Sequence, residues 1–219
     1  FCKPLHVKIQ SIGVKGDGVA LYKGRPVFIP YTLPGDVVKI SLINSKRARM
    51  VQLRTEGPGR VKPHCQHFGT CGGCSMQHLN EKSYSTWKEN NLHRLLKRWK
   101  IGPKNVLPIE LGAVKRRRRA RLHFRRSRKG LIAGFCELHS YRVTSIKDCP
   151  VLTEGLNKFL APLRKALSLM FLGSAAGEVT FTDTEQGIDL VLKMEVKPSL
   201  VDREVIADIA HENDIARIS

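Results

Sequence analysis

Four cysteines have the spacing of metal ligands: Cys65, Cys71 and Cys74 in the run CQHFGTCGGC, and Cys149, which precedes Pro150. Three thiolates within ten residues and a fourth from a distance can surround one metal centre. Paired Cys or Cys/His spacings are usual in structural zinc sites, whereas a Cys-rich run completed by Cys-Pro is typical of iron–sulfur ligation. The spacing therefore favours a 4Fe-4S cluster.

The residues around these cysteines bear on the metal assignment. Gly72 and Gly73 have no side chains, so the backbone between the second and third cysteines can approach a bulky inorganic core. The zinc alternative stays open because three histidines flank the run, namely His64, His67 and His78. Of the other cysteines, we expect Cys2 to be a bystander at the N-terminus and Cys136 to be a small core residue.

The charge of the chain is unevenly distributed. Of 219 residues, 38 are Lys or Arg and 19 are Asp or Glu, which gives a net charge of +19. Residues 151–219 hold 7 basic and 11 acidic residues, a net of −4, so residues 1–150 carry +23. This asymmetry predicts a polyanionic partner for the first two-thirds of the chain. A membrane surface is the weaker alternative, because no helix joins a basic face to a large apolar one.

The sequence has the features expected of a cytoplasmic protein. No stretch is long and apolar enough to span a bilayer, and the start FCKPLHVKI has no signal peptide. We therefore expect a reducing cytosol, free cysteines and a monomer. The chain lacks an initial Met and its last segment, DIARIS, reads as the start of a strand, so we expect a piece of a longer protein.

Residues 4–61 read as five short strands separated by Gly, Pro, Asp or Lys-rich breaks. Five short strands in so few residues predict a small closed β-barrel of the oligonucleotide-binding type. A tight turn is expected at Lys23-Gly24. The connection at residues 44–49 is basic, and three of its side chains are predicted to contact phosphate: Lys46, Arg47 and Arg49.

Residues 83–100 are predicted to form a helix after the cysteine loop, which is the segment of residues 62–80. The apolar residues of this helix fall on one face with a period of 3.6: Tyr84, Trp87, Leu92, Leu95 and Trp99. We expect this face to pack on a core, with both tryptophans as core anchors. Gly102-Pro103 is expected to end the helix.

Residues 115–129 carry the densest charge, with ten Lys or Arg in fifteen positions. A disordered basic tail is the plain alternative. The run RARLHF alternates, however, because Ala120, Leu122 and Phe124 point one way, and the opposite side carries Arg117, Arg119, Arg121, His123 and Arg125. This pattern predicts a strand with an apolar side and an arginine side that grips phosphates and stacks on bases of structured RNA.

Residues 153–212 are predicted to form a helix, a hairpin and a second helix. The first helix covers 153–171, with Thr153 as its N-cap and Pro162 expected to break or kink it. The hairpin turns at residues 185–187. The last helix covers 200–212 and is expected to start at Pro198 or Ser199.

Four segments of the chain together resemble the iron–sulfur RNA uracil-5-methyltransferases, most closely the bacterial 23S rRNA 5-methyluridine enzymes. Residues 27–36 match a VFIPxxLPGD-like segment of the barrel called TRAM, and residues 60–78 match RVxPxCxxFGxCGGCxxQH. Residues 116–122 match a YRNKARL-like strand, with Arg116 and Arg118 in place of Tyr and Asn. Residues 134–151 match a segment that ends in CPV, so the resemblance covers nearly the whole chain.

The resemblance implies S-adenosylmethionine-dependent methylation of uridine at C5 in 23S rRNA. In such enzymes a cysteine attacks C6 of a flipped uridine, the methyl group moves to C5, and a carboxylate removes the C5 proton. The family pattern places the 4Fe-4S ligands at the same four cysteines and implies a structural cluster. The catalytic residues, and the doubly wound domain that binds S-adenosylmethionine, are expected to be absent from this chain, which is then inactive alone.

The predicted fold class is α+β. Residues 1–61 are expected to form a TRAM-type, oligonucleotide-binding-like barrel that binds RNA. Residues 62–219 are expected to form a central mixed α/β domain with the four-cysteine site, without the C-terminal Rossmann-like domain. Three other functions stay open: a tRNA uracil-5-methyltransferase of the same family, a stand-alone RNA-binding metal module, and a redox protein that uses the cluster for electron transfer.

Overall fold

The computed structural model describes residues 5–102, 106–170 and 175–219, which divide into two compact units. Unit 1 comprises the described residues up to Gly69 together with Cys74–Leu111, and unit 2 comprises Thr70–Gly73 and Gly112–Ser219. Residues of the cysteine loop are thus divided between the units, and Cys2 lies outside the described residues. No helix in the described ranges is long and apolar enough to cross a membrane. The predicted domain boundary between residues 61 and 62 stays a prediction.

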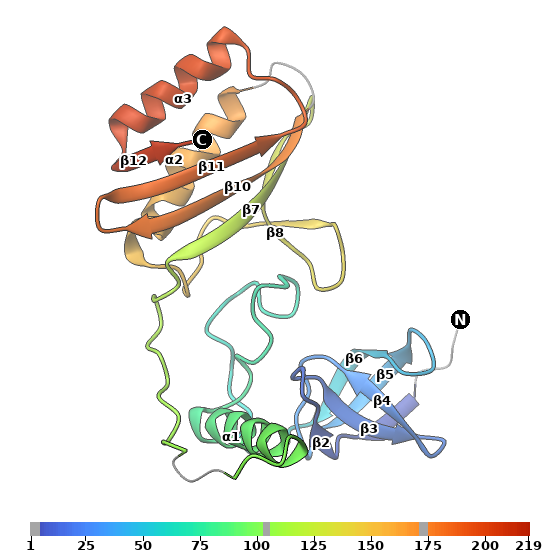
Figure 1. Cartoon of the computed structure of the whole chain (residues 1–219). Helices are drawn as coiled ribbons and strands as arrows, with labels where there is room; N and C mark the ends of the chain where they lie inside the picture. The colour runs from blue at the N-terminus through green and yellow to red at the C-terminus, as the bar shows by residue number, and fades with distance from the viewer. Residues whose placement is uncertain (1–4, 103–105, 171–174) are drawn as a thin grey trace. The chain divides into compact units, whose positions relative to one another are not determined.

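Six strands of unit 1 form two three-stranded antiparallel sheets (Figure 1). One sheet has the order β1-β5-β6, with β1 (Leu5–Lys8), β5 (Val37–Leu42) and β6 (Ala48–Thr55). The other has the order β2-β3-β4, with β2 (Ser11–Ile12), β3 (Gly18–Tyr22) and β4 (Arg25–Ile29). These paired sheets share one apolar core, which includes Val7, Ile9, Ala20, Val27, Ile29, Val38, Ile40 and Ala48.

The predicted single closed barrel of five strands is wrong, because the strands lie in two sheets. The first predicted strand changes sheet midway: the N–H of Ile9 donates to the carbonyl of Asp36 at 2.8 Å, and the N–H of Gln10 donates to β3 at 2.8 Å. Its first half therefore pairs as β1 with β5, and its second half pairs as β2 with β3. On the other side, β4 meets the chain ahead of β6 through an isolated bridge between Phe28 and Arg47, not a ladder.

The turn between β3 and β4 is the tight turn expected from the sequence. Tyr22 pairs with Arg25, so the loop consists of Lys23 and Gly24 alone. Both residues have positive φ, 51° and 74°. Positive φ at both central positions defines the type I′ turn, whose twist suits an antiparallel hairpin. This prediction is confirmed.

A buried ion pair fixes the segment that leads into the cysteine loop. The side chain of Asp36 is fully buried and accepts hydrogen bonds from the N–H groups of Leu33 and Gly57, both at 2.8 Å. It also forms an ion pair with Arg60, whose Nη2 donates to the carbonyl of Tyr31 at 3.1 Å. A charge removed from water in this way is stable only with its partners in place. The loop therefore starts from a fixed point on the paired sheets.

Helix α1 (Glu81–Arg98) agrees with the predicted helix within two residues at each end. Its N-cap is Asn80, whose side chain accepts the N–H of Ser83 at 2.8 Å. The expectation that both tryptophans are core anchors is wrong for Trp99, which is 71% exposed, and none of the residues of α1 is fully buried. The small paired sheets cover only the face of the helix that carries Trp87, so most of its apolar stripe stays exposed.

Unit 2 is built on a six-stranded sheet with the order β12-β11-β10-β7-β8-β9. All neighbouring strands are antiparallel except β11 and β12, which makes the sheet mixed. The strands are β7 (Arg119–Ser127), β8 (Gly130–Cys136), β9 (Val143–Ser145), β10 (Ala175–Thr184), β11 (Gly187–Met194) and β12 (Ile215–Ile218). The hairpin of β10 and β11 turns where expected, and the segment DIARIS contains the predicted strand.

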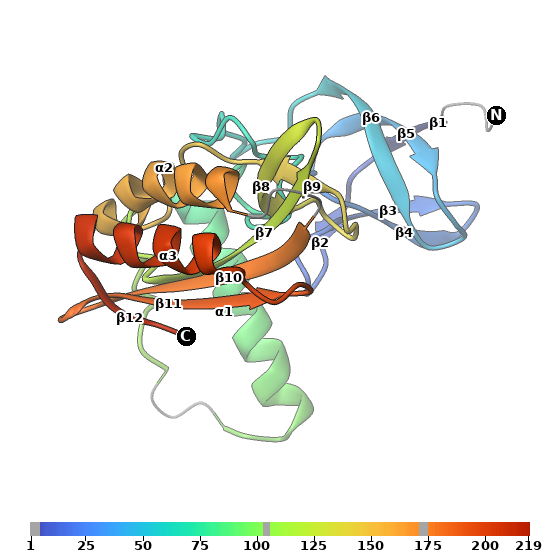
Figure 2. The ribbon, with the colours of Figure 1, turned by 90° about the horizontal axis from the view of Figure 1, so that it is seen from above.

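Two helices, α2 (Glu154–Leu169) and α3 (Leu200–Glu212), lie on one side of this sheet, as Figure 2 shows. Leu156, Leu160 and Leu163 of α2 belong to the same buried cluster as the apolar side of β7. Pro162 lies inside α2, so the expected break is absent. Thr153 is the N-cap residue but makes no side-chain capping bond, whereas Ser199 forms a full capping box at the start of α3.

Candidate functional site

The predicted arginine strand is β7, and its alternation is confirmed. Ala120, Leu122 and Phe124 are 8%, 0% and 2% exposed and belong to the core beneath α2. The residues between them therefore point to the opposite side of the sheet. We call this set the arginine face, and it consists of Arg119, Arg121, His123 and Arg125, of which the three arginines are exposed.

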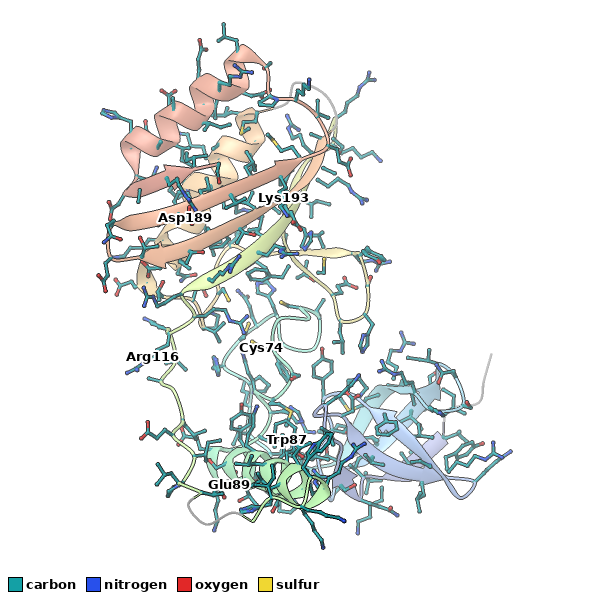
Figure 3. All side chains as sticks on the ribbon, viewed as in Figure 1. Cys74, Trp87, Glu89, Arg116, Asp189 and Lys193 are labelled. Atoms are coloured by element: carbon teal, nitrogen blue, oxygen red, sulfur yellow. The ribbon has the colours of Figure 1, made fainter. Side chains whose placement is uncertain are left out.

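Two carboxylates that the sequence analysis missed lie on the same side of the sheet. Glu178 of β10 is 3.5 Å from Arg121 and 3.7 Å from Lys193, measured between carboxylate oxygen and side-chain nitrogen. Asp189 of β11 forms a bidentate pair with Arg217, both bonds at 2.9 Å, which lowers the pKa of Asp189. Figure 3 labels Asp189 and Lys193 on this sheet. The face is therefore mostly cationic but includes two carboxylates. The alternation of residues along β10 and β11 is the sequence pattern that could have revealed these carboxylates.

The other basic residues predicted to contact RNA lie at three places. Lys46 and Arg47 follow Asn44, whose side-chain oxygen accepts both of their N–H groups at 2.9 Å and so shapes the connection between β5 and β6. Lys46 and Arg49 are exposed, and Arg49 belongs to β6. Arg117 precedes β7 and is held by a backbone bridge, because its N–H donates to the carbonyl of residue 151 at 2.9 Å. Their contact with RNA stays a prediction.

The part of the cysteine loop in unit 2 is docked on the end of β8. The N–H of Gly72 donates to the carbonyl of Cys136 at 2.9 Å, and Cys71 forms a bridge with Glu137. A Cβ on Gly72 would lie 2.9 Å from that carbonyl oxygen. Gly72 is thus required by the close approach of two backbones. The N–H of Gly73 donates to Sγ of Cys71 at 3.4 Å, the type of hydrogen bond that tunes metal-bound sulfur.

Cys149 also belongs to unit 2 and lies in a rigid turn. Its N–H donates to the side-chain oxygen of Asn157 at 2.8 Å, and its carbonyl accepts the N–H of Leu152 at 3.1 Å. Asn157 comes from α2 and donates its own amide to Asp148 at 2.6 Å. Cys149 packs partly buried against the main core of the unit. Helix α2 therefore holds the Cys-Pro turn in place.

The remaining predicted ligands, Cys65 and Cys74, lie in unit 1, where Figure 3 labels Cys74 ahead of α1. The N–H of Cys65 donates to the side chain of Gln77 at 3.2 Å. His78 is fully buried against the ring of Phe68. Burial, reinforced by the nearby charge of Arg60, lowers the pKa of His78 to about 4. A neutral, enclosed imidazole is a packing element of this loop.

Among the described residues, Cys65, Cys71, Cys74, Cys136 and Cys149 form no disulfide. Within the described residues no three His, Cys, Asp or Glu side chains gather as a metal site. Two predicted ligands belong to each unit, Cys65 and Cys74 to unit 1 and Cys71 and Cys149 to unit 2. Four thiols, of which Cys71 accepts a backbone N–H at its sulfur, are a donor set that suits iron–sulfur ligation. The ligand assignment stays a proposal.

Comparison with known proteins adds to this geometry. Residues 3–48 match the TRAM domain model. The chain is 32% identical to an uncharacterized RNA methyltransferase of Rhizobium meliloti over 97% of its length, and 32% identical to a 23S rRNA (uracil(1939)-C(5))-methyltransferase RlmD of Pectobacterium carotovorum over 98%. It covers 52% and 49% of these relatives, so it spans about half the length of the curated relatives it matches.

A solved structure shares the fold. The match is a Pyrococcus abyssi tRNA (uracil-54, C5)-methyltransferase in complex with S-adenosyl-L-homocysteine, with a TM-score of 0.58 and 20% identity. It covers 91% of this chain and 48% of that chain. At this identity the match shows a shared fold, and the TRAM match places the first part of the chain in a TRAM-containing class of proteins. The TRAM match and relatives named as RNA methyltransferases over nearly the whole chain support the RNA uracil-5-methyltransferase family that the sequence motifs indicate.

The structure and the comparisons correct one expectation and leave a second without support. The fold-class prediction counted a Rossmann-like methyltransferase domain as absent beside a barrel and a central domain. That statement is wrong, because the described fold is two small sheets and one mixed sheet, and a methyltransferase structure matches it over 91% of the chain. The further expectation, that the catalytic domain is missing and the chain is inactive alone, has no support in the comparisons.

Proposed function

We propose that the protein takes part in S-adenosylmethionine-dependent methylation of uridine at C5 in structured RNA, with 23S rRNA as the substrate. The observation that carries the proposal is the arginine face of β7, whose side chains are presented by a strand with a fully buried opposite side. A strand fixed by its core holds guanidinium groups in place, so little freedom is lost when they bind phosphates. The family supports uracil C5 as the methylated atom.

The choice of cofactor and RNA follows from the relatives. The structural neighbour is named as a complex with S-adenosyl-L-homocysteine, the product of methyl transfer from S-adenosylmethionine, which supports that methyl donor for this family. Its named substrate is tRNA, whereas the name of the Pectobacterium relative specifies 23S rRNA. We favour rRNA because that relative is 32% identical, against 20% for the tRNA enzyme. A cytoplasmic location is consistent with either substrate.

Methyl transfer is tested with the natural protein, labelled S-adenosylmethionine and transcripts of 23S rRNA and tRNA, followed by nucleoside mass spectrometry. We expect 5-methyluridine in the rRNA transcript and none in the tRNA transcript. Label in tRNA alone would show that the substrate is tRNA and not 23S rRNA. Label in neither RNA, from protein that binds both, would refute the methyltransferase proposal and leave a stand-alone RNA-binding module.

We also propose that Cys65, Cys71, Cys74 and Cys149 hold a 4Fe-4S cluster. Support comes from the C-x5-C-x2-C spacing, the Cys-Pro turn and the N–H···S bond at Cys71. When bound, the cluster would supply four iron–sulfur bonds between distant parts of the sequence, which is a structural role. In the chain itself, Gly73 orients the Cys71 thiolate, and Asn157 orients the turn that presents Cys149.

Iron and acid-labile sulfide analysis of anaerobically reconstituted protein tests this assignment. Cys149→Ser should lower iron and sulfide far below four per chain. Cys136→Ser is the matched control, because Cys136 is also half-buried in unit 2 but lies outside the ligand set. Equal metal loss in both variants, or stoichiometric zinc without sulfide in the parent chain, would overturn the cluster.

A further inference from the structure

A groove of about 770 Å³ lies within unit 1, between the paired sheets and α1. Ser11 and Ile12 of β2 line one wall, and side chains of α1 line the other. Leu33, Pro34 and Leu79 contribute a mostly apolar floor. The volume falls within the roughly 300–1,000 Å³ of pockets that hold organic ligands. The groove can therefore take a flat apolar group with space to spare.

Trp87 gives this groove a rigid aromatic wall. Its indole Nε1 donates to the carbonyl of Gly13 at 3.1 Å, a bond that joins α1 to the turn after β2. The ring is half-buried, in contrast to Trp99 at the end of the helix. Figure 3 labels Trp87 on α1, near Glu89. A fixed, partly open aromatic ring is the usual element against which unpaired bases lie.

The charge along the groove is of one sign. Lys82, Arg94 and Lys97 line it together with His93, and the residues that line it include no Asp or Glu. Glu89 of the same helix turns elsewhere, because its carboxylate accepts the N–H of Ile109 at 3.5 Å. From residue 82 to residue 97 the helix rises roughly 22 Å at 1.5 Å per residue. The cations thus form a row several nucleotides long.

We propose that this groove binds an unpaired segment of RNA, with bases against the apolar floor and Trp87 and with phosphates on Lys82, Arg94 and Lys97. A flexible polyanion with flat apolar faces matches both the floor and the row of cations, which an apolar peptide does not. The inference rests on the proposed RNA-binding function. It adds a single-strand site on unit 1 to the arginine face of unit 2.

Tryptophan fluorescence tests the groove directly, because the chain has two tryptophans. In Trp99→Phe protein all emission comes from Trp87. An eight-nucleotide single-stranded RNA should quench this emission, and the same sequence annealed to its complement should quench it much less. In Trp87→Phe protein the exposed Trp99 should report a far smaller change.

Charge reversal on α1 supplies the second measurement, by anisotropy of the labelled single strand. Arg94→Glu/Lys97→Glu should weaken binding at least ten-fold and flatten the log–log salt dependence by about 1.4, at roughly 0.7 for each phosphate contact on a single strand. Arg98→Glu/Lys100→Glu makes the same change in charge at the C-terminal end of α1, away from the residues that line the groove, and should bind nearly as the parent chain does. Both pairs are exposed, so equal melting temperatures are expected.

The outcomes separate this inference from the proposed function. If RNA binding depends on Arg119 and Arg121 but is unaffected by Arg94→Glu/Lys97→Glu, the groove assignment is overturned and the arginine face stands. If the parent chain binds no RNA of either kind, the proposed function itself fails. If Trp87 emission responds to protein concentration and not to RNA, the groove is a contact between copies of the chain, which also overturns the assignment.

Discussion

If the arginine face binds RNA as proposed, Glu178 competes with the RNA for Arg121 and Lys193, so replacing Glu178 should tighten RNA binding. Its carboxylate lies 3.5 Å from Arg121 and 3.7 Å from Lys193, between the strands that present them. Both cations must loosen these pairs to bind phosphate. Glu178→Gln keeps the size of the side chain and removes the negative charge.

The expected gain follows from the exposure of these groups. The side chains of Arg121 and Lys193 are 58% and 69% exposed, and that of Glu178 is 22% exposed. Exposed ion pairs contribute about 0.2–1 kcal/mol each, and both are only partly broken by binding. A net gain of about 0.5–1 kcal/mol corresponds to roughly two- to five-fold tighter binding.

Anisotropy of a fluorescent 23S rRNA fragment at fixed ionic strength measures this change. Glu204→Gln is the control, since Glu204 is exposed on α3, on the opposite side of the sheet. We expect the gain in Glu178→Gln alone. Equal tightening in both variants would show that the effect comes from the net charge of the protein and not from the position of Glu178. No tightening in Glu178→Gln would refute the reasoning that RNA contacts this face.

Three further perturbations test the parts that hold the site. The pKa of His78 is about 4 in the folded protein, against 6.5 when unfolded, so the folded protein keeps this side chain neutral. Its contribution to stability is therefore full above pH 6.5 and is lost as the pH falls toward 4. Urea unfolding should show a loss of about 2–3 kcal/mol over this pH range, which His78→Gln should remove and the control His93→Gln should keep. Asp36→Asn leaves a buried guanidinium unpaired and should cost about 3–5 kcal/mol of unfolding free energy by circular dichroism, and a loss below 1 kcal/mol would contradict that account. Gly72→Ala should raise hydrogen exchange in residues 70–73, because its Cβ would meet a carbonyl at 2.9 Å, whereas Gly112→Ala, with open space around it, should not.

Local patterns predicted the elements of this fold well. The helix at residues 81–98, the hairpin of β10 and β11 and the two sides of β7 each depend on periodicity within a few residues. The turn at Lys23-Gly24 was predictable because few residue pairs accept positive φ at both positions. The cysteine loop could likewise be found from the spacing of its thiols and glycines.

Features that depend on pairing between distant segments were not predictable. The strand that divides at Ile9 and Gln10 looks continuous in sequence, and only its hydrogen bonds to two sheets reveal the change. Glu178 and Arg121 are 57 residues apart, and their contact depends on the register of β7 and β10. Trp99 continues the apolar stripe of α1, but the periodicity does not show whether another element covers that position, and Trp99 is exposed.

The central claim, that the arginine face binds RNA phosphates, is tested most directly by the salt dependence of binding in Arg119→Ala/Arg121→Ala. Removing one arginine–phosphate interaction should flatten the log–log slope by roughly 0.7–0.9, so the double variant should show a slope flatter by about 1.4–1.8 and bind more weakly. Lys165→Ala/Arg203→Ala, which removes the same charge from α2 and α3 on the opposite side of the sheet, should keep the parent slope. An unchanged slope in Arg119→Ala/Arg121→Ala would contradict the claim.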